Sequence, residues 1–501
     1  MENYSESVLK SKSSEILIGI SIISIFILFF IDKSNIYNYI FALINLGIIY
    51  KFFNQNTSKM FYYITLLFAI MGMTLGIHLK KYIGIDEQVN IYYIYLAIYI
   101  FIFIIDFFKS FKKEEVKNIF TDYINILFII FAVYTFASFV LAEDKKLAII
   151  KLLYYGVMFA LVIMIVRENR TKEELYGTLR FLGVISCGML IMGVFKIVTG
   201  IQLEANSSYL TPGAPLSSIN PPFNRIPTLF FYNPNNYALV AVVILIAFSI
   251  YLVSNTKNNQ LVIGTIIVLA EINIFFTRSR TGWIAVVITL IFISLVLLLK
   301  KNWKKAILIL TPMIIFLVLF KGFEYIKSAD FLYAKLGEME QQVDENGEVI
   351  TDGEIHLGNT GSINVRATLM ADVLQGVIKE KNYLGFGPGN IQRYIKELDN
   401  THRRYDPHCW WLEILGDFGV IGFLSFTLGY FLMALRLFIT FLTRDDFTDV
   451  SLLSLALLAT TSMLVFSPSS VFRLVPFWIV IGLALATSSQ IFCNKRKKEG
   501  N

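Results

Sequence analysis

Long apolar runs constrain the fold of this chain more than any other feature of its sequence. Runs of about 17–25 apolar residues recur along the chain, and each is long enough to cross the hydrocarbon core of a bilayer. Of the 501 residues, 56% are hydrophobic and only 16% are charged, and the mean hydropathy is +0.63. A soluble domain of this size carries far more charge. We therefore predict an all-α polytopic membrane protein.

Length and hydrophobicity predict about fourteen transmembrane helices. The first apolar run lacks a small-residue cleavage site, so we expect a retained helix rather than a signal peptide. The twelfth run is long enough to hold a surface turn, because Gly416, Gly419 and Gly422 cluster near its start. The predicted helices cover residues 16–31, 35–51, 61–79, 89–108, 122–142, 148–166, 179–199, 237–254, 260–277, 282–299, 306–320, 411–441, 449–466 and 472–491.

Basic residues predict how the chain is oriented in the membrane. Lysines and arginines gather at 109–117, 300–305 and 495–498, and Lys10 and Lys12 precede the first apolar run. With fourteen helices all of these residues lie on one side, which the positive-inside rule identifies as the cytoplasm. We therefore expect a protein of the cytoplasmic membrane with both termini in the cytoplasm. The formal net charge of +7 reflects these loops, so we predict no nucleic-acid partner.

Under this topology the chain divides into four consecutive segments. Residues 1–199 hold the N-terminal transmembrane helices, and residues 200–320 form a central membrane region with a Pro- and Asn-rich outer loop. Residues 321–409 form a large extracytoplasmic loop, and residues 410–501 hold the C-terminal transmembrane helices. The large loop is the only soluble-like region long enough to have structure of its own.

Three local patterns give the large loop an expected structure. Residues 344–348 contain an Asn-Gly pair, which is typical of a hairpin turn. Residues 362–380 have helical periodicity, with Ser362 as the candidate N-cap. The glycine-rich run 385–390 forces a turn, and we expect a short helix after it to about Leu398.

His408 is the first candidate for chemistry, because it closes the large loop just before an apolar run. Imidazole is the side chain best suited to accept a proton near neutral pH. On position alone, an interfacial histidine that only caps a helix explains the residue better. Asp417 follows within the same segment, where its carboxylate either orients a partner or satisfies backbone groups.

Four arginines are predicted on the outer side of the membrane. Arg278 and Arg280 lie in a tight link between two apolar runs, against the positive-inside bias. Guanidinium groups in such a place are costly unless they meet an anion, although a pair that reaches lipid headgroups explains them equally well. Arg225 and Arg366 lie in outer loops, where a lone arginine is usually solvated. Together with His408, the four arginines predict a diphosphate-binding site.

The sequence predicts no metal site and no cofactor. The three cysteines form no CxxC motif, and the four histidines show no metal-binding spacing such as HExxH. The acidic stretch 338–354 lacks the spacing of an EF-hand loop. A solvated acidic flap explains that stretch better than a cation site does.

Four short elements resemble the bacterial O-antigen ligase and polymerase family of membrane glycosyltransferases. Arg225 followed by Asn-Pro-Asn at 233–235 is similar to the family's arginine and NPN element. Ser-Arg-Thr-Gly at 279–282 is similar to its SRTG turn. Arg366 followed by Leu-Gly-Phe-Gly-Pro-Gly-Asn at 384–390 resembles its arginine helix and LGxGPGN turn.

The run that starts at His408 carries the fourth element. Residues 408–422 follow the family pattern HNxxLxxLxExGxxG with two departures. Cys409 stands where the family often has Asn, and Asp417 stands where it often has Glu. Both changes are chemically mild and concern substrate positioning more than reaction class. The four elements occur in the family's order over residues 200–425.

The resemblance implies a GT-C-like fold and an inverting, metal-independent glycosyltransferase. Its donor is a glycan on a polyprenyl diphosphate, usually undecaprenyl diphosphate, and its acceptor is a glycan, a lipid, a wall polymer or a protein. Arg225, Arg280 and Arg366 would neutralise the leaving diphosphate, with Arg278 in reserve. His408 would activate or position the acceptor hydroxyl. Other membrane proteins of polysaccharide assembly are further candidate partners.

Three readings of the function stay open. The abundance of Ile, Lys and Asn hints at an AT-rich genome and a Gram-positive host without a lipopolysaccharide core, which favours a surface polysaccharide polymerase over a ligase. A polysaccharide flippase is the alternative from another class. A flippase should carry charged residues inside its helices. The predicted helices of this chain are nearly free of charged residues, and Lys196 and Glu271 are the main exceptions. A structural scaffold of the assembly machinery is the third reading.

Overall fold

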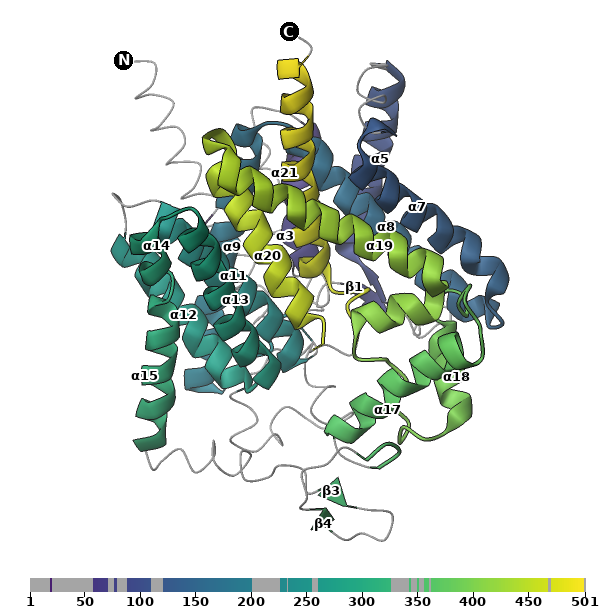
Figure 1. Cartoon of the computed structure of the whole chain (residues 1–501). Helices are drawn as coiled ribbons and strands as arrows, with labels where there is room; N and C mark the ends of the chain where they lie inside the picture. The colour runs from purple at the N-terminus through teal and green to yellow at the C-terminus, as the bar shows by residue number, and fades with distance from the viewer. Residues whose placement is uncertain are drawn as a thin grey trace. The chain divides into compact units, whose positions relative to one another are not determined.

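Figure 1 shows the computed structural model of the chain. The chain divides into two compact units. Unit 1 comprises Met1–Phe111 and Ala160–Ser279, and unit 2 comprises Lys112–Phe159 and Arg280–Asn501. The structure describes residues 19, 57–70, 76–78, 88–109, 120–200, 226–231, 233–254, 260–325, 342–343, 349–350, 356–359, 362–466 and 470–499.

Helices make up most of both units. Unit 1 contains α3 (Thr57–Ile70), β1 (Gly76–His78), β2 (Gln88–Asn90), α5 (Ile91–Lys109), the C-terminal part of α8 (Lys145–Glu168), α9 (Lys172–Thr199), α11 (Pro234–Ser254) and α12 (Gln260–Thr277). Unit 2 contains α7 (Tyr123–Ala137), η1 (Ser138–Leu141), the start of α8, α13 (Arg280–Leu299), α14 (Trp303–Leu308), α15 (Thr311–Tyr325), β3 (Gln342–Val343), β4 (Val349–Ile350), α17 (Ser362–Leu374), η6 (Gln375–Lys379), α18 (Asn390–Leu398), α19 (Trp410–Thr443), η7 (Asp445–Phe447), α20 (Thr448–Leu464) and α21 (Val475–Glu499).

The predicted fold class is confirmed. Within the described residues, nine helices are long and apolar enough to cross a membrane, and shorter apolar helices accompany them. The protein is therefore an all-α polytopic membrane protein, with two short hairpins among the described residues. The predicted helices 16–31 and 35–51 lie outside the described residues apart from residue 19, so the count of about fourteen stays a prediction. The division into four consecutive segments also stays a prediction.

Two predicted helix boundaries were wrong. The helix expected over 61–79 ends at Ile70, and Gly76–His78 instead pair with Gln88–Asn90 as an antiparallel hairpin. Glycine at positions 72 and 76 lowers the helix propensity of this stretch. The helix expected over 306–320 is divided between α14 and α15. Pro312 explains that division, because proline is tolerated in the first turn of a helix but not in its interior.

The expected elements of the large loop are present in the described residues. β3 and β4 pair antiparallel on either side of the predicted Asn-Gly turn, whose own residues lie outside the described ones. The predicted helix begins at Ser362 and continues through α17 and a π-helical turn to Lys379. The short helix after the glycine-rich turn is α18, which ends at Leu398 as expected.

A buried ion pair fixes one end of unit 2. The Arg436 guanidinium on α19 donates to both carboxylate oxygens of Asp122 at 2.6 and 2.7 Å. Asp122 is also the N-cap of α7 and accepts from the Ile124 amide at 3.1 Å. Arg496 near the end of α21 donates to Thr121 at 2.8 Å. The start of α7 and the ends of α19 and α21 therefore meet at one end of this unit.

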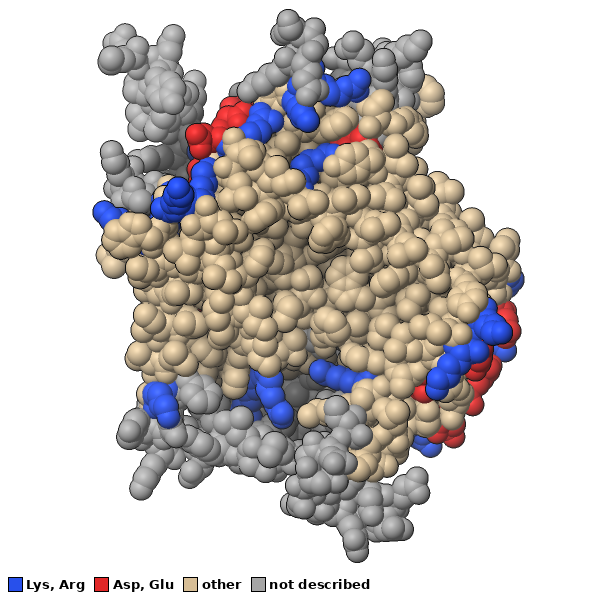
Figure 2. All heavy atoms as spheres, viewed as in Figure 1, with Lys and Arg blue, Asp and Glu red and all other residues tan. Residues whose placement is uncertain are grey.

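The charged side chains of unit 2 separate toward its two ends. Lys300 pairs with Asp445, which directly follows α19, at 3.2 Å. Arg393 on α18 pairs with Glu143, which follows α7, at 2.9 Å. On the face drawn in Figure 2, few charged side chains lie over α19 and α20 between these ends. Lys300, just after α13, and the basic residues at the end of α21 thus lie at the end opposite to α18, as the predicted membrane orientation requires.

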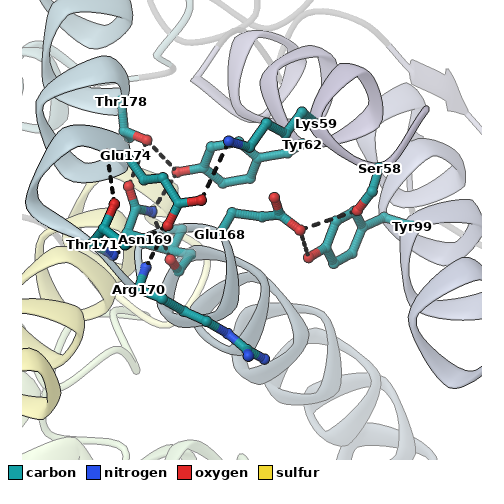
Figure 3. Close-up of polar contacts among 11 residues, drawn as sticks. Ser58, Lys59, Tyr62, Tyr99, Glu168, Asn169, Arg170, Thr171, Glu174 and Thr178 are labelled. Carbon is teal, nitrogen blue, oxygen red and sulfur yellow. Dashed lines mark hydrogen bonds and ion pairs between the residues drawn. The ribbon is translucent and has the colours of Figure 1, made fainter. Parts of the chain in front are cut away.

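A polar network joins the helices of unit 1 where α8 passes into α9 (Figure 3). Glu168 accepts hydrogen bonds from Ser58 on α3 at 3.0 Å and from Tyr99 on α5 at 2.6 Å. Asn169 donates to the buried Tyr62 hydroxyl at 2.8 Å. Each buried polar group of this set has a partner, which makes the network a structural one.

Two ion pairs and a helix cap also lie at this end of unit 1. Thr171 and Glu174 form a capping box at the start of α9. Glu174 also pairs with Lys59 at 3.3 Å, and Arg167 pairs with Asp106 at 3.3 Å. The contact between Lys59 and Glu174 holds the start of α9 against α3.

Candidate functional site

The glycine-rich turn 384–390 is joined to the first part of α19 through the backbone. Helix α19 is interrupted at Gly419, which has φ 58° and ψ −160°. The Val420 amide therefore donates to the Tyr383 carbonyl at 2.8 Å instead of to a carbonyl one turn back in its own helix. The Gly416 carbonyl, released by this break, accepts from the Phe386 amide at 2.9 Å. The broken helix and the turn thus satisfy each other's backbone groups.

Glycine is required where the two backbones meet. Gly385 has φ 86°, and a Cβ on it would lie 2.4 Å from the Gly419 amide nitrogen. A Cβ on Gly419 would lie 2.2 Å from the Tyr383 carbonyl oxygen. The twelfth apolar run is thus interrupted within its glycine cluster, but by a buried break at Gly419 between two helical parts rather than by the surface turn that the sequence predicts. Because α19 is about 51 Å long and a hydrocarbon core about 30 Å, only the part after Gly419 is needed to span a bilayer.

Asp417 caps the helix that follows the turn. Its carboxylate accepts from the Gly389 amide at 2.8 Å and from the Ile391 amide at 3.2 Å. Gly389 is the N-cap of α18 and carries no side chain that could do this itself. The Asp417 side chain is fully buried. Of the two roles that the sequence left open for Asp417, the structure supports the satisfaction of backbone groups.

The helices of the large loop pack against the first turn of α19. Leu412 contacts an apolar cluster between α17 and α18. Arg366 follows a member of this cluster, Val365, and is half-buried. His408 lies one turn before Leu412 and is half-buried as well. The large loop therefore carries Arg366 to the end of unit 2 at which His408 lies. The buried members of the cluster are Val365, Leu369, Val373, Ile391 and Ile395.

Arg280 lies at the same end of unit 2 as His408. Lys300, just after α13, donates to Thr448 at the start of α20 at 3.0 Å, so the two packed helices are antiparallel. The start of α13, which is Arg280, therefore lies toward the C-terminal end of α20. There the Val465 carbonyl accepts from the Trp410 amide at 3.4 Å, two residues after His408. Arg280 is exposed.

For the other two predicted arginines, membership of this site stays a prediction. Arg278 lies in unit 1, directly after α12, and Arg225 lies outside the described residues. Both Arg278 and His408 have left-handed backbones, with φ 57° and 51°. Such conformations are uncommon for residues other than glycine and gather at functional sites. Burial lowers the pKa of the Arg278 guanidinium, and an anion beside it would oppose that effect.

A buried ion pair beside the turn was missed by the sequence reasoning. Lys151 on α8 pairs with Glu413 on α19 at 3.0 Å, and both side chains are almost fully buried. Ser470 donates to Glu413 at 2.6 Å. The Lys151 ammonium also lies 3.7 Å from the centre of the Phe472 ring. The sequence does contain a signal for this site, because Lys151 is an ionisable residue inside an apolar run.

Arg473 is a further basic residue at this end of unit 2. Its guanidinium lies 3.9 Å from the centre of the Tyr154 ring, one turn of α8 from Lys151. It follows α20 and precedes α21 in a link too short to show a motif. Among the described residues no group of three or more His, Cys, Asp or Glu side chains gathers as a metal site.

The fold and this arrangement define a polytopic membrane protein with arginines and a histidine gathered where a loop meets a broken helix. Residues 264–427 match the family model described as O-antigen ligase. The match covers the motifs at 279–282, 384–390 and 408–422 together with Arg366, and it excludes Arg225. The match supports a member of the O-antigen ligase and polymerase family, which the motifs predict. No curated protein matches the chain.

Proposed function

We propose that this protein is an inverting, metal-independent glycosyltransferase that acts on glycans carried by undecaprenyl diphosphate at the outer face of the cytoplasmic membrane. The family match supports a membrane glycosyltransferase of ligase or polymerase type with a polyprenyl-linked donor. The observation that carries the proposal is the convergence of Arg280, Arg366 and His408 on one end of unit 2. The turn 384–390 and Asp417 hold that end together.

The proposed reaction is a single displacement at the anomeric carbon of the donor. His408 takes the proton from an acceptor hydroxyl, and the acceptor oxygen forms a bond to the anomeric carbon. The bond from that carbon to the diphosphate oxygen breaks, and the leaving diphosphate keeps the electron pair. Attack from the side opposite the leaving group inverts the configuration.

Arginines supply the charge that this step needs. The diphosphate gains one negative charge as it leaves, and guanidinium groups bind phosphate oxygens in a bidentate fork while staying charged. We assign this role to Arg280 and Arg366, which lie at the same end as His408, and to Arg225 and Arg278 from the motifs. Because four guanidinium groups are available, the proposal needs no metal to neutralise the leaving group.

The proposed orientation places the large loop outside the cell. Basic residues at 300–305 and 495–498 lie at the end of unit 2 opposite to α18, which supports a cytoplasmic location for that end. In the proposed orientation the protein therefore binds the lipid-linked donor at the outer face of the membrane. We favour a polymerase of surface polysaccharide, in which the acceptor is another lipid-linked repeat rather than a lipid core, wall polymer or protein.

The test is His408→Ala in the native host. Surface polysaccharide is resolved as a size ladder, and lipid-linked intermediates are extracted from the same cells. A polymerase predicts that long polymer disappears while single lipid-linked repeats accumulate. A ligase predicts that full-length polymer accumulates on the lipid carrier instead.

His402→Ala is the matched control. His402 is an exposed histidine of the same loop, six residues earlier, whose imidazole contacts the Gly358 carbonyl at 2.9 Å. It should leave the ladder unchanged. An unchanged ladder in His408→Ala, with normal membrane insertion, would contradict the proposed role of His408 and leave it a residue that caps a helix.

A further inference from the structure

The segment that joins α17 to the glycine-rich turn exposes large apolar side chains, although it lies outside the membrane-spanning helices. Leu374 at the end of α17 and Ile378 in η6 are 40% and 54% exposed. Tyr383 and Leu384, just before the turn, are each 50% exposed. These four residues are called the apolar rim below. Large apolar side chains gathered on the surface of one folded element indicate a contact with a partner or a membrane.

The apolar rim is not the face by which the loop packs. Leu369, Val373 and Val377 lie on the other face of the same continuous helix and are fully buried. Leu369 and Val373 belong to the cluster that contacts Leu412 on α19. The helix is therefore apolar on two faces, of which only one is buried in the protein. A helix that is surrounded by water on its exposed face carries polar side chains there.

Two hydrogen bonds join the apolar rim to transmembrane helices of the same unit. The Val420 amide on α19 donates to the Tyr383 carbonyl at 2.8 Å. The Tyr134 hydroxyl on α7 donates to the Leu384 carbonyl at 3.0 Å. Val420 and the next residue, Ile421, expose apolar side chains, which in a membrane-spanning helix face lipid. The apolar rim therefore continues the lipid-facing surface of α19.

The length of α19 gives the depth of this contact in the bilayer. The part from Val420 to Thr443 is about 36 Å long, and a hydrocarbon core is about 30 Å thick. Val420 begins this part, so it lies close to the boundary between hydrocarbon and headgroups. Tyr383 is bonded to Val420 and lies at the same level. Tyrosine is enriched at this boundary, because its ring is apolar and its hydroxyl is polar.

Lysines lie within the apolar rim. Lys379 and Lys381 are both exposed. The Glu380 carboxylate between them accepts a hydrogen bond from the Tyr394 hydroxyl on α18, which directs it toward the folded loop. A lysine stem covers apolar surface while its ammonium reaches headgroup phosphates. Apolar side chains beside lysines are typical of a segment that lies in the membrane interface.

We propose that residues 374–384 dock on the surface of the bilayer on the side of the large loop. The apolar rim enters the interface, and Lys379 and Lys381 bind the phosphates of anionic lipid headgroups. The bilayer is the partner because the rim is bonded to transmembrane helices at the level where the hydrocarbon ends. This contact holds one end of the glycine-rich turn at the membrane surface. The inference does not depend on the proposed reaction, since it uses only the membrane topology of unit 2.

The test places a bimane fluorophore at Leu384→Cys in the full-length protein, reconstituted in vesicles of phosphatidylcholine and phosphatidylglycerol. The quencher is phosphatidylcholine that carries a nitroxide near the carbonyl end of its acyl chain. We expect Leu384→Cys to be quenched as strongly as Ile421→Cys on α19. Quenching should be several times weaker at Glu397→Cys, an exposed position on α18. The native cysteines are removed in all variants by Cys187→Ala, Cys409→Ala and Cys493→Ala.

Aqueous iodide and a second rim position make the result decisive. Thermal unfolding first shows that each labelled protein is folded. If Leu384→Cys and Ile378→Cys are quenched by the lipid as weakly as Glu397→Cys, and by iodide as strongly, the proposal is overturned. Protection of both rim positions from lipid and iodide alike would also overturn it, because a protein contact would then cover the apolar rim.

Nitroxide-labelled phosphatidylglycerol tests the headgroup contact. At equal content it should quench Leu384→Cys more strongly than labelled phosphatidylcholine does. The added pair Lys379→Gln and Lys381→Gln should lower this preference about fivefold. Lys396→Gln is the matched control, since it removes an exposed lysine of α18 and should leave the preference unchanged. A preference that survives the loss of both rim lysines would overturn their assignment to anionic headgroups.

Discussion

Replacing Asp417 with alanine should release α18 from the start of α19. The wild-type carboxylate accepts two backbone hydrogen bonds, from Gly389 and Ile391, at 2.8 and 3.2 Å. Alanine offers no acceptor and leaves both amides without a partner in a buried place. The first turn of α18 then lacks the negative charge that favours a helix N-terminus.

The magnitude follows from the two hydrogen bonds. A hydrogen bond to a charged group contributes about 1.5–3 kcal/mol, and removing a buried carboxylate recovers part of its desolvation cost. We therefore expect the local stability of the turn and α18 to fall by about 3 kcal/mol. That fall corresponds to roughly a hundredfold rise in the population of the locally open state. Asp417→Asn should give a smaller effect, because one oxygen acceptor remains.

Hydrogen–deuterium exchange read by mass spectrometry measures this opening directly. Peptides over 384–398 should exchange roughly a hundredfold faster in Asp417→Ala, while peptides from α20 and α21 keep their rates. Glu397→Ala is the control, since it removes an exposed carboxylate from the same helix whose ion pair with Arg393 is a surface one. Unchanged exchange over 384–398 in Asp417→Ala would refute the assignment of Asp417 as the cap.

Two further predictions concern buried charges of unit 2. Lys151→Met leaves Glu413 buried with Ser470 as a partner, and the loss of one member of such a pair costs about 3–5 kcal/mol. Thermal unfolding should show this, and the double variant with Glu413→Gln should recover most of it; a single variant as stable as wild type would count against the pair. Burial raises the pKa of Asp372 above 3.8, while a hydrogen bond from Asn400 opposes the rise. The Asp372 carboxyl then holds its proton more tightly in the folded protein than in the unfolded chain, so the free energy of unfolding falls as pH rises from 3.8 through the raised pKa. In Asp372→Asn the slope of this free energy against pH should flatten. An unchanged slope would show that Asp372 is not the group responsible.

The sequence predicts the fold class because a transmembrane helix leaves a signal in every residue of its span. The ends of helices were harder to predict where a single residue, such as proline or glycine, interrupts the apolar pattern. Pro312 divided one expected helix, and glycines at 72 and 76 accompanied the early end of another. The hairpin of β3 and β4, α17 and α18 were predictable, since turn and helix signals act over a few residues.

The candidate site was predictable only as far as its residues lie in motifs. The motifs identify His408, Arg280 and Arg366, and α17, α19 and the antiparallel packing of α13 on α20 bring them to one end of unit 2. The partners of Asp417 and Lys151 were beyond the sequence, because these contacts join residues far apart in the chain. The structure explains why glycine is needed at positions 385 and 419: two backbones approach each other closely there, and a Cβ would not fit.

The most direct measurement of the central claim is the release of undecaprenyl diphosphate by the purified protein. The protein is reconstituted in vesicles with lipid-linked oligosaccharide extracted from the host, and both lipid and glycan products are followed by mass spectrometry. Our account predicts that free undecaprenyl diphosphate appears together with a longer glycan, that both continue in the presence of EDTA, and that neither forms with His408→Ala. Transfer of intact lipid-linked donor across the vesicle membrane, without release of undecaprenyl diphosphate, would contradict the account and favour a flippase.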